Sequence, residues 1–201
     1  MLRIKLDRCP YDDILFKNLN REVKEGLTVL TGCNGSGKST FLRYVESKYE
    51  KNDAYKIFHW NGLTDKSIIR QKSLSNDIRF LATLATSSEG EEINMNLSVI
   101  AGEIGRFVKD NNRNIILLLD GADSGLSIDN IIEVKNFLKE LLIPDVQKQG
   151  KEIYVIVSAN SYEMAKGEVC TDVRTGKEMT FTDYTDYRRY ILDTKKNKEK
   201  R

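Results

Sequence analysis

The sequence is short of cysteine and of net charge, and each shortage excludes a class of protein. The three cysteines, Cys9, Cys33 and Cys170, are an odd number without metal-like spacing, so neither a disulfide framework nor a zinc knuckle is expected. The 32 basic and 30 acidic residues leave a net charge of +2, which gives no bulk field for nucleic acid or an anionic membrane. Any partner must therefore be inferred from local sites.

The chain also lacks a long apolar run. No stretch approaches the roughly 20 apolar residues that span a bilayer, and Arg3, Lys5 and Asp7 interrupt the apolar core that a signal peptide needs. We therefore expect a cytoplasmic protein with no transmembrane segment of its own. With 201 residues, of which 40% are hydrophobic, residues 1–192 are predicted to form one domain. The charged residues 193–201 are predicted to be a disordered tail.

The sequence does contain a glycine-rich stretch between a strand-like run, 27–31, and a helical pattern. It reads Gly32-Cys33-Asn34-Gly35-Ser36-Gly37-Lys38-Ser39-Thr40 and matches the phosphate-binding pattern G-x-x-x-x-G-K-[ST]. Glycines let successive N–H groups converge on a polyphosphate, and the helix start adds the positive end of its dipole. Lys38 can reach the β- and γ-phosphates, and the Ser39 hydroxyl suits Mg²⁺. The alternative is a glycine-rich turn that only closes a strand.

Predicted strands and helices alternate around this loop. Strands are expected from the apolar runs at 55–60, 115–119 and 153–157, and helices from the periodicity over 41–49, 88–108, 129–141 and 184–192. Short strands near the N-terminus indicate an added antiparallel piece, and 168–181 indicates a hairpin. Pro144 is expected to break or kink a helix. The predicted fold class is α/β, a P-loop NTPase with a mainly parallel central sheet flanked by helices.

An aspartate closes the most aliphatic of these strands. Asp120 follows the run 115–119, and the carboxyl ends of parallel strands gather at one edge of a sheet, where the phosphate loop is also expected. A carboxylate there can hold, through water, the Mg²⁺ that Ser39 contacts. Lys38 and Asp120 are therefore predicted to be catalytic, with ATP and Mg²⁺ as the bound species. A strand-end cap is the alternative for Asp120.

Two motifs together resemble a known family. The phosphate loop is one, and the other is the run Leu118-Leu119-Asp120-Gly121-Ala122-Asp123-Ser124-Gly125-Leu126-Ser127. Both are similar to motifs of the ABC-type ATPases, in the branch of the SMC, Rad50 and RecF proteins. The resemblance covers 2–192, and the pattern over 184–191 looks like that of small stand-alone ATPases of phages and mobile elements. Only about 50 residues separate Lys38 from Ser88, so the coiled-coil arms of SMC and Rad50 proteins have no room.

The sequence departs from this family at two catalytic positions. Gly121 stands where the family has a glutamate that acts as general base, and Asn160 stands where it has a histidine that senses the γ-phosphate. Loss of a general base commonly costs about 10²–10⁴-fold in rate, so slow hydrolysis is expected. Asp123 is expected at a surface position on its loop, and it could act as the base if that loop folds inward.

The stretch Ser88-Glu89-Gly90-Glu91 resembles the shortened signature motif of the same branch. The resemblance implies that Ser88 and Gly90 contact, in trans, the γ-phosphate held by the opposite subunit. The alternative is a capping box, in which Ser88 and Glu91 satisfy N–H groups at a helix start. The two readings are compatible, because a capped helix start still presents N–H groups to an anion.

Two further residues come from the resemblance alone. Gln71 would be the glutamine that senses Mg²⁺, and exposed polar helix surface is the alternative. Tyr11 would stack on adenine, and packing of this aromatic ring on the sheet is the alternative.

The resemblance implies an ATPase that converts ATP and water to ADP and phosphate. It implies a head-to-tail homodimer, in which each ATP lies between Lys38, Ser39 and Asp120 of one subunit and Ser88 and Gly90 of the other. One alternative is a non-hydrolysing regulator, or a DNA-end-binding accessory protein of repair or recombination, that uses ATP as a latch. The net charge does not support DNA binding. A third alternative is the ATPase subunit of a membrane transporter.

Overall fold

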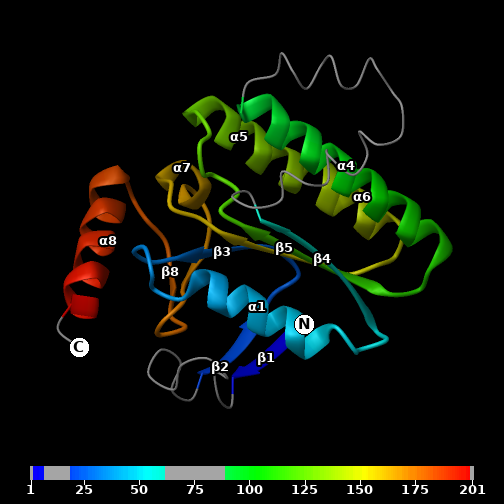
Figure 1. The fold of residues 1–201 in the computed structure, drawn as a ribbon, viewed down its shortest axis with the longest axis horizontal. Helices are drawn as coiled ribbons and strands as arrows, with labels where there is room; N and C mark the ends of the chain where they lie inside the picture. The colour runs from blue at the N-terminus through cyan, green and yellow to red at the C-terminus, as the bar shows by residue number, and fades with distance from the viewer. Residues whose placement is uncertain (1, 7–18, 62–88, 200–201) are drawn as a thin grey trace.

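The computed structural model describes residues 2–6, 19–61 and 89–199. Its central sheet has six strands in the order β4-β5-β6-β3-β7-β8 (Figure 1). These strands are β3 (Gly26–Thr31), β4 (Tyr55–Asn61), β5 (Asn114–Asp120), β6 (Ile153–Ser158), β7 (Cys170–Asp172) and β8 (Glu178–Met179). All neighbours pair in parallel except β7 and β8, which form an antiparallel hairpin. The predicted mainly parallel α/β sheet is confirmed.

A separate two-stranded sheet forms the N-terminal piece. In it, β1 (Leu2–Leu6) pairs antiparallel with β2 (Leu19–Val23). Val23 is buried against the side chains of α1 (Lys38–Tyr49), so the end of this small sheet joins the core on the α1 face of the central sheet. The predicted antiparallel addition is therefore confirmed.

Helices cover both faces of the central sheet (Figure 1). On one face lies α1, and on the other lie α4 (Glu89–Asp110), α5 (Ile128–Asn136), the π-helical segment η1 (Phe137–Leu142) and α6 (Ile143–Lys148). The short helix α7 (Tyr162–Ala165) follows β6, and α8 (Tyr184–Glu199) stands at the end of the sheet. Within the described residues, no helix is long and apolar enough to cross a bilayer.

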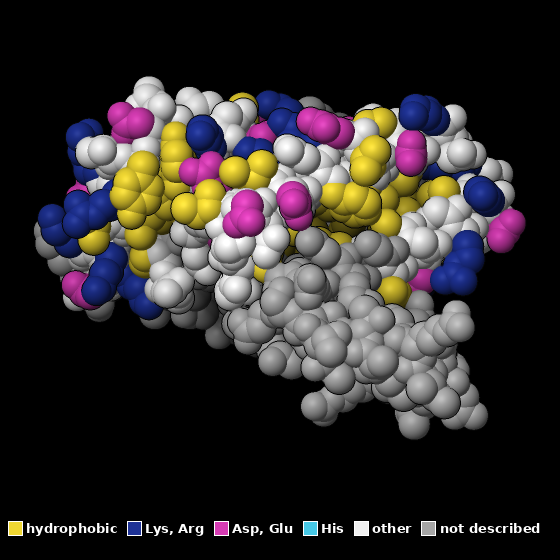
Figure 2. Space-filling model, turned by 90° about the horizontal axis from the view of Figure 1, so that it is seen from above, with side chains coloured by type: hydrophobic (Ala, Val, Ile, Leu, Met, Phe, Trp, Pro, Cys, Tyr) yellow, Lys and Arg dark blue, Asp and Glu magenta, His cyan; other side chains and the backbone are white. Residues whose placement is uncertain are grey.

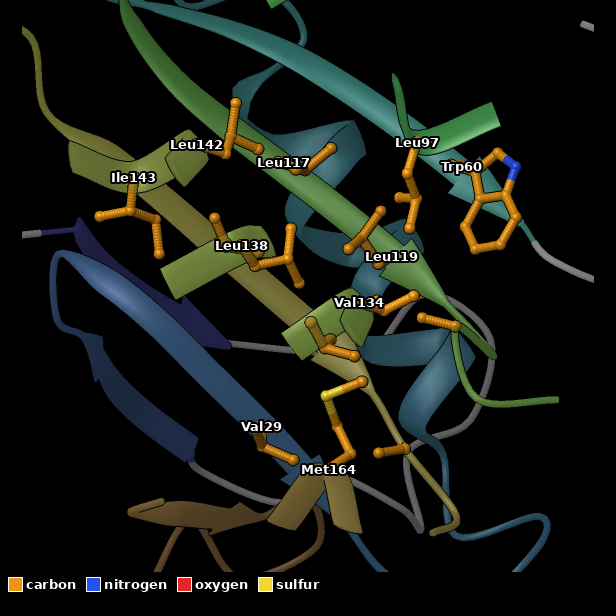
Figure 3. Packing of buried hydrophobic residues seen from close by; sticks show 14 of the residues in the cluster. Val29, Trp60, Leu97, Leu117, Leu119, Val134, Leu138, Leu142, Ile143 and Met164 are labelled. Atoms are coloured by element: carbon orange, nitrogen blue, oxygen red, sulfur yellow. The ribbon is translucent and has the colours of Figure 1, made fainter. Parts of the chain in front are cut away.

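The two faces of β5 divide the core into two clusters. Leu117 and Leu119 pack with Leu97 of α4 and Leu138 of η1 (Figure 3), whereas Leu118 packs toward α1 on the opposite face. Successive side chains of a strand point to opposite faces, so a strand with helices on both sides must be apolar at every position. This explains the continuous aliphatic run that precedes Asp120.

The helix that follows β5 continues past Pro144, so of the expected break or kink the break is wrong. Helical structure continues from Ile128 to Lys148 through the π-helical segment η1. The N–H of Ile143 bonds the carbonyl of Leu138, five residues earlier. The wider turn accommodates a proline, which has no N–H to donate and whose ring would otherwise clash with the preceding turn.

The predicted disordered tail is also corrected, because α8 continues to Glu199 instead of ending near Leu192. Tyr187 and Thr194 are buried at helical spacing along this helix, and Ile191 between them packs against the core. The lysines of the last turns occupy the exposed side of a helix whose other side rests on the domain. Tertiary packing thus orders a segment whose composition alone indicates a solvated terminus.

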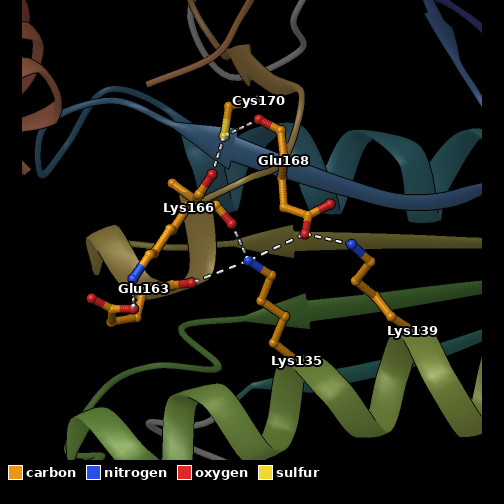
Figure 4. A network of polar contacts seen from close by, with 7 residues as sticks. Lys135, Lys139, Glu163, Lys166, Glu168 and Cys170 are labelled. Carbon is orange, nitrogen blue, oxygen red and sulfur yellow. Dashed lines mark hydrogen bonds and ion pairs between the residues drawn. The ribbon is translucent and has the colours of Figure 1, made fainter. Parts of the chain in front are cut away.

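A polar network joins α5 to the segment between β6 and β7 (Figure 4). Glu168 Oε1 lies 3.2 Å from Lys135 Nζ and 2.7 Å from Lys139 Nζ. Lys135 Nζ also donates to the backbone carbonyls of Glu163 and Lys166. The network fixes α7 against α5, and thereby fixes the loop that follows β6.

Candidate nucleotide-binding site

Three strand ends meet at one edge of the sheet. β3 ends at Thr31, directly before the phosphate loop, β5 ends at Asp120 and β6 ends at Ser158. β6 lies between β3 and β5, with Ser158 paired to Asp120 in the parallel register. Ligands of open α/β sheets bind at the carboxyl ends of the strands, so this edge is a candidate ligand-binding site.

The phosphate loop is a tight turn that only glycine permits at its start. Gly32 has a φ of 142°, and a Cβ at this position would lie 2.6 Å from Ser36 Oγ. The N–H of Ser36 donates to the carbonyl of Cys33 at 3.1 Å, which closes the loop before α1 begins. The sequence pattern therefore produces the strand, loop and helix that a phosphate site requires.

The groups inside the loop suit an anion. Within the described residues, no side chain caps the N-terminus of α1 at Gly37, and its first turn contains no acidic residue. Ser36 Oγ is buried and has no hydrogen-bond partner among the described residues. Uncapped N–H groups at a helix start and an unpartnered hydroxyl are donors that phosphate oxygens would satisfy, so the loop fits the triphosphate of ATP.

Lys38 lies folded over this loop. Its Nζ donates to the carbonyl of Gly32 at 2.7 Å and to that of Cys33 at 3.3 Å, and the residue is only 8% exposed. Burial lowers the pKa of Lys38, while the nearby Cys33, Asp123 and Asp120 act in the opposite direction. A buried ammonium held mainly by neutral carbonyls would gain from an anionic ligand, as the phosphate-binding role requires.

Ser39 and Asp120 come together from distant parts of the chain. Ser39 Oγ donates to Asp120 Oδ1 at 3.0 Å, and Ser158 Oγ donates to the same oxygen at 2.5 Å. Ser158 Oγ in turn accepts the N–H of Gly121 at 2.9 Å. A hydroxyl and a carboxylate in contact, beside a phosphate loop, fit a hydrated Mg²⁺ ion. The described residues contain no cluster of three metal-binding side chains, so such an ion would need phosphate and water as its other ligands.

Asp123 is buried, which corrects the expectation of a surface position on its loop. Its Oδ2 accepts the N–H of Asn160 at 2.6 Å and also the N–H of Ser161, and the residue is 7% exposed. Its Oδ1 has no partner among the described residues. Asp123 thus binds the backbone that follows β6, and its negative charge acts to raise the pKa of Lys38.

Gly121 and Asn160 occupy the two positions at which the chain departs from the ABC-type pattern. Gly121 has a φ of 65°, a conformation that favours glycine over the glutamate of that pattern. Asn160 is held through its backbone, because its carbonyl accepts the hydroxyl of Tyr187 at 2.8 Å. Tyr187 belongs to α8, and burial raises the pKa of its hydroxyl, which keeps it protonated as a donor.

The remaining predicted site residues are only partly described. Tyr11, Gln71 and Ser88 lie outside the described residues, and Gly90 lies in the first turn of the described part of α4. Thr40 lies in the first turn of α1. The carbonyl of Asn34 accepts Lys198 Nζ at 3.2 Å.

Sequence reasoning missed three residues that contact this site. Ser158 ends an aliphatic strand, and a serine at such a position has no distinguishing pattern. Thr194 and Lys198 lie in the segment that was predicted to be a disordered tail, yet Thr194 Oγ1 accepts the N–H of Cys33 at 3.3 Å. The signal that could have found them is the helical spacing of Tyr187, Ile191 and Thr194.

We compared the chain with curated proteins, solved structures and family models. No curated protein sequence matches the chain. Among solved structures, the Orc1 protein of Aeropyrum pernix in complex with DNA is similar, with 16% sequence identity and a TM-score of 0.41. The similarity covers 87% of this chain and 44% of that chain, so the matched part is less than half of that chain. A model of the AAA domain matches residues 21–164, which contain the phosphate loop, Asp120 and Asn160, and the chain therefore belongs to the AAA domain family of P-loop ATPases.

Proposed function

We propose that this protein binds ATP with Mg²⁺ at the edge of its central sheet and hydrolyses it slowly. The observation that carries the proposal is the 3.0 Å contact between Ser39 Oγ and Asp120 Oδ1, directly beside the uncapped start of α1. Ser39 belongs to α1 and Asp120 to β5. Together with Lys38 and the N–H groups of α1, they supply ligands for the cation and donors for the phosphates. A glycine-rich turn that only closed a strand would not require this convergence.

Each residue has a defined part in the proposed binding. The N–H groups of the first turn of α1, and Ser36 Oγ, donate to phosphate oxygens. The ammonium group of Lys38 would donate to phosphate oxygens in place of the carbonyls of Gly32 and Cys33. Ser39 and Asp120 would hold the cation, which would neutralise charge on the phosphates. Ser158 keeps the Asp120 carboxylate in place through its hydrogen bond.

Slow hydrolysis follows from the shortage of a general base near these groups among the described residues. Gly121 has no side chain that could take a proton from water, and one oxygen of Asp123 is engaged by two backbone N–H groups. Loss of a general base commonly costs about 10²–10⁴-fold in rate. We therefore infer a long-lived ATP-bound state.

We further propose that ATP joins two copies of the chain head to tail. The support is the sequence motif Ser124-Gly125-Leu126 and the stretch 88–91, which resemble the motifs that meet across the ABC-type dimer. Ile128, the first residue of α5, follows this motif and is 64% exposed, as expected of a side chain that a partner would cover. Ser88 and Gly90 of one copy would then complete the site of the other.

Size-exclusion chromatography with light scattering, combined with measurement of bound nucleotide, tests both proposals. Wild type is expected to retain ATP with Mg²⁺ and to double its mass, whereas Lys38→Ala should do neither. Lys48→Ala is the matched control, because it removes the same charge from an exposed position at the far end of α1. Failure of wild type to bind ATP would refute the site, and binding without a change in mass would refute the dimer alone.

A further inference from the structure

The last turns of α8 lie against the phosphate loop. Thr194 is buried and accepts the N–H of Cys33 at 3.3 Å, which anchors the helix on the loop. One turn further on, Lys198 Nζ donates to the carbonyl of Asn34 at 3.2 Å. A side chain at Gly35 would overlap this ammonium group. The loop therefore has a second lysine over it, in addition to Lys38.

A cleft of about 370 Å³ separates the loop from α8. It is lined by the loop residues 32–34, by Asn160 and by three charged residues of α8, Lys195, Lys198 and Glu199. Lys195 Nζ lies 3.9 Å from the carboxylate of Glu199, so these two charges offset each other. Lys198 has no carboxylate partner among the described residues, and its charge is the one left to meet an anion in the cleft.

We propose that Lys198 binds the phosphates of the nucleotide, as a second lysine of the site. An ammonium group has three donors, and one of them suffices for the carbonyl of Asn34, so the others can reach phosphate oxygens. The inference rests on the proposed function, because it assumes that ATP occupies the loop. Lys198 lies beyond residues 21–164, which match the AAA domain.

The competing explanation of Lys198 is purely local. Lysines in the last turn of a helix stabilise it by offsetting the negative end of its dipole, and both Lys196 and Lys198 occupy the last turn of α8. Under that explanation the two lysines are equivalent. They differ only in position, because Lys198 lines the cleft and contacts the loop, whereas Lys196 does not line the cleft.

Isothermal titration of ATP with Mg²⁺ at low ionic strength, into wild type, Lys198→Gln and Lys196→Gln, separates the two explanations. The glutamine side chain can still donate to the carbonyl of Asn34, so Lys198→Gln removes mainly the charge. It is expected to weaken ATP binding about tenfold, the effect of one charge-assisted hydrogen bond. Lys196→Gln should stay within about twofold of wild type, and the loss at Lys198 should shrink as salt is added.

Thermal unfolding of the two variants provides the control for folding. Equal melting temperatures with a selective loss of ATP affinity in Lys198→Gln support the proposal. Equal ATP affinities in the two variants overturn it and leave the site of Lys38, Ser39 and Asp120 intact. If wild type binds no ATP, the proposed function fails first, so the two failures are distinguishable.

Discussion

Asp123 offers the sharpest test of how the site is built. It was a candidate for the missing general base, yet its Oδ2 accepts the N–H of Asn160 at 2.6 Å and the N–H of Ser161. A hydrogen bond to a charged group contributes about 1.5–3 kcal/mol. Two such bonds stabilise the fold, and the cost of burying the unpartnered Oδ1 offsets part of their contribution. We therefore expect Asp123→Ala to lower the free energy of unfolding by about 3 kcal/mol.

Asp123→Asn separates the structural role from a catalytic one. The amide oxygen can still accept an N–H but cannot take a proton from water, so we expect a loss of roughly 1–2 kcal/mol in stability. ATP turnover, measured where the variant is fully folded, should stay within about threefold of wild type. Urea unfolding gives the free energy, and Asp145→Asn, at an exposed position in α6, should leave both quantities unchanged.

The opposite pattern would refute this reasoning. If Asp123→Asn kept the stability of wild type and lost ATP turnover by about 100-fold or more, Asp123 would be the general base. The hydrogen bonds to Asn160 and Ser161 would then be incidental to its function.

Three further predictions concern the stability of the fold around the site. Ser158→Ala should lower the free energy of unfolding by about 1–3 kcal/mol in urea, because the N–H of Gly121 loses its acceptor, and an unchanged value would contradict the chain of bonds to Asp120. Glu168→Gln should cost about 3 kcal/mol in the same assay, since the largely buried side chain of Lys135 would lose its counter-charge, and a loss below about 0.5 kcal/mol would show that the pair is dispensable. Burial raises the pKa of the Cys170 thiol to about 12 from 9.0, so above this ordinary value the unfolded thiol ionises while the folded one stays protonated. The free energy of unfolding should therefore fall by up to about 1.4 kcal/mol per pH unit, and Cys170→Ser should show a shallower fall.

The parts of the fold that follow from the sequence are those in which local pattern and tertiary environment agree. The aliphatic run before Asp120 could only be a buried strand with helices on both faces, and the glycines before Lys38 required a loop between strand and helix. Parallel strands end at the same edge, so the meeting of Ser39 and Asp120 follows from those two elements.

The remaining features depend on tertiary contacts that leave no local mark. The lysine-rich end of α8 has the composition of a solvated tail, and it is helical because Thr194 and Lys198 find partners on the phosphate loop. Pro144 signals a break, but the π-helical segment before it keeps the helix continuous. Asp123 was expected at the surface because nothing in the sequence reveals that its carboxylate binds the backbone after β6.

In the part of the chain that the structure describes, the surface outside the site gives no comparable indication of a partner. On the face seen in Figure 2, hydrophobic side chains lie among basic and acidic ones, in keeping with the net charge of +2. A second cleft beside α8 has a volume of about 630 Å³, and its lining includes Tyr162, Tyr184 and Tyr187. This cleft borders Asn160, so a partner seated there would contact the loop that Asp123 holds.

The affinity for ATP with and without Mg²⁺ tests the central claim most directly. Titration calorimetry on wild type, Ser39→Ala and Asp120→Asn compares how much Mg²⁺ strengthens ATP binding, while Lys38 and the glycines of the phosphate loop remain unchanged. Loss of an outer-shell carboxylate typically weakens metal binding by about 10–100-fold, so both variants are predicted to lose most of the Mg²⁺ effect. If Mg²⁺ strengthened ATP binding equally in all three proteins, the proposal that Ser39 and Asp120 bind the cation would be contradicted.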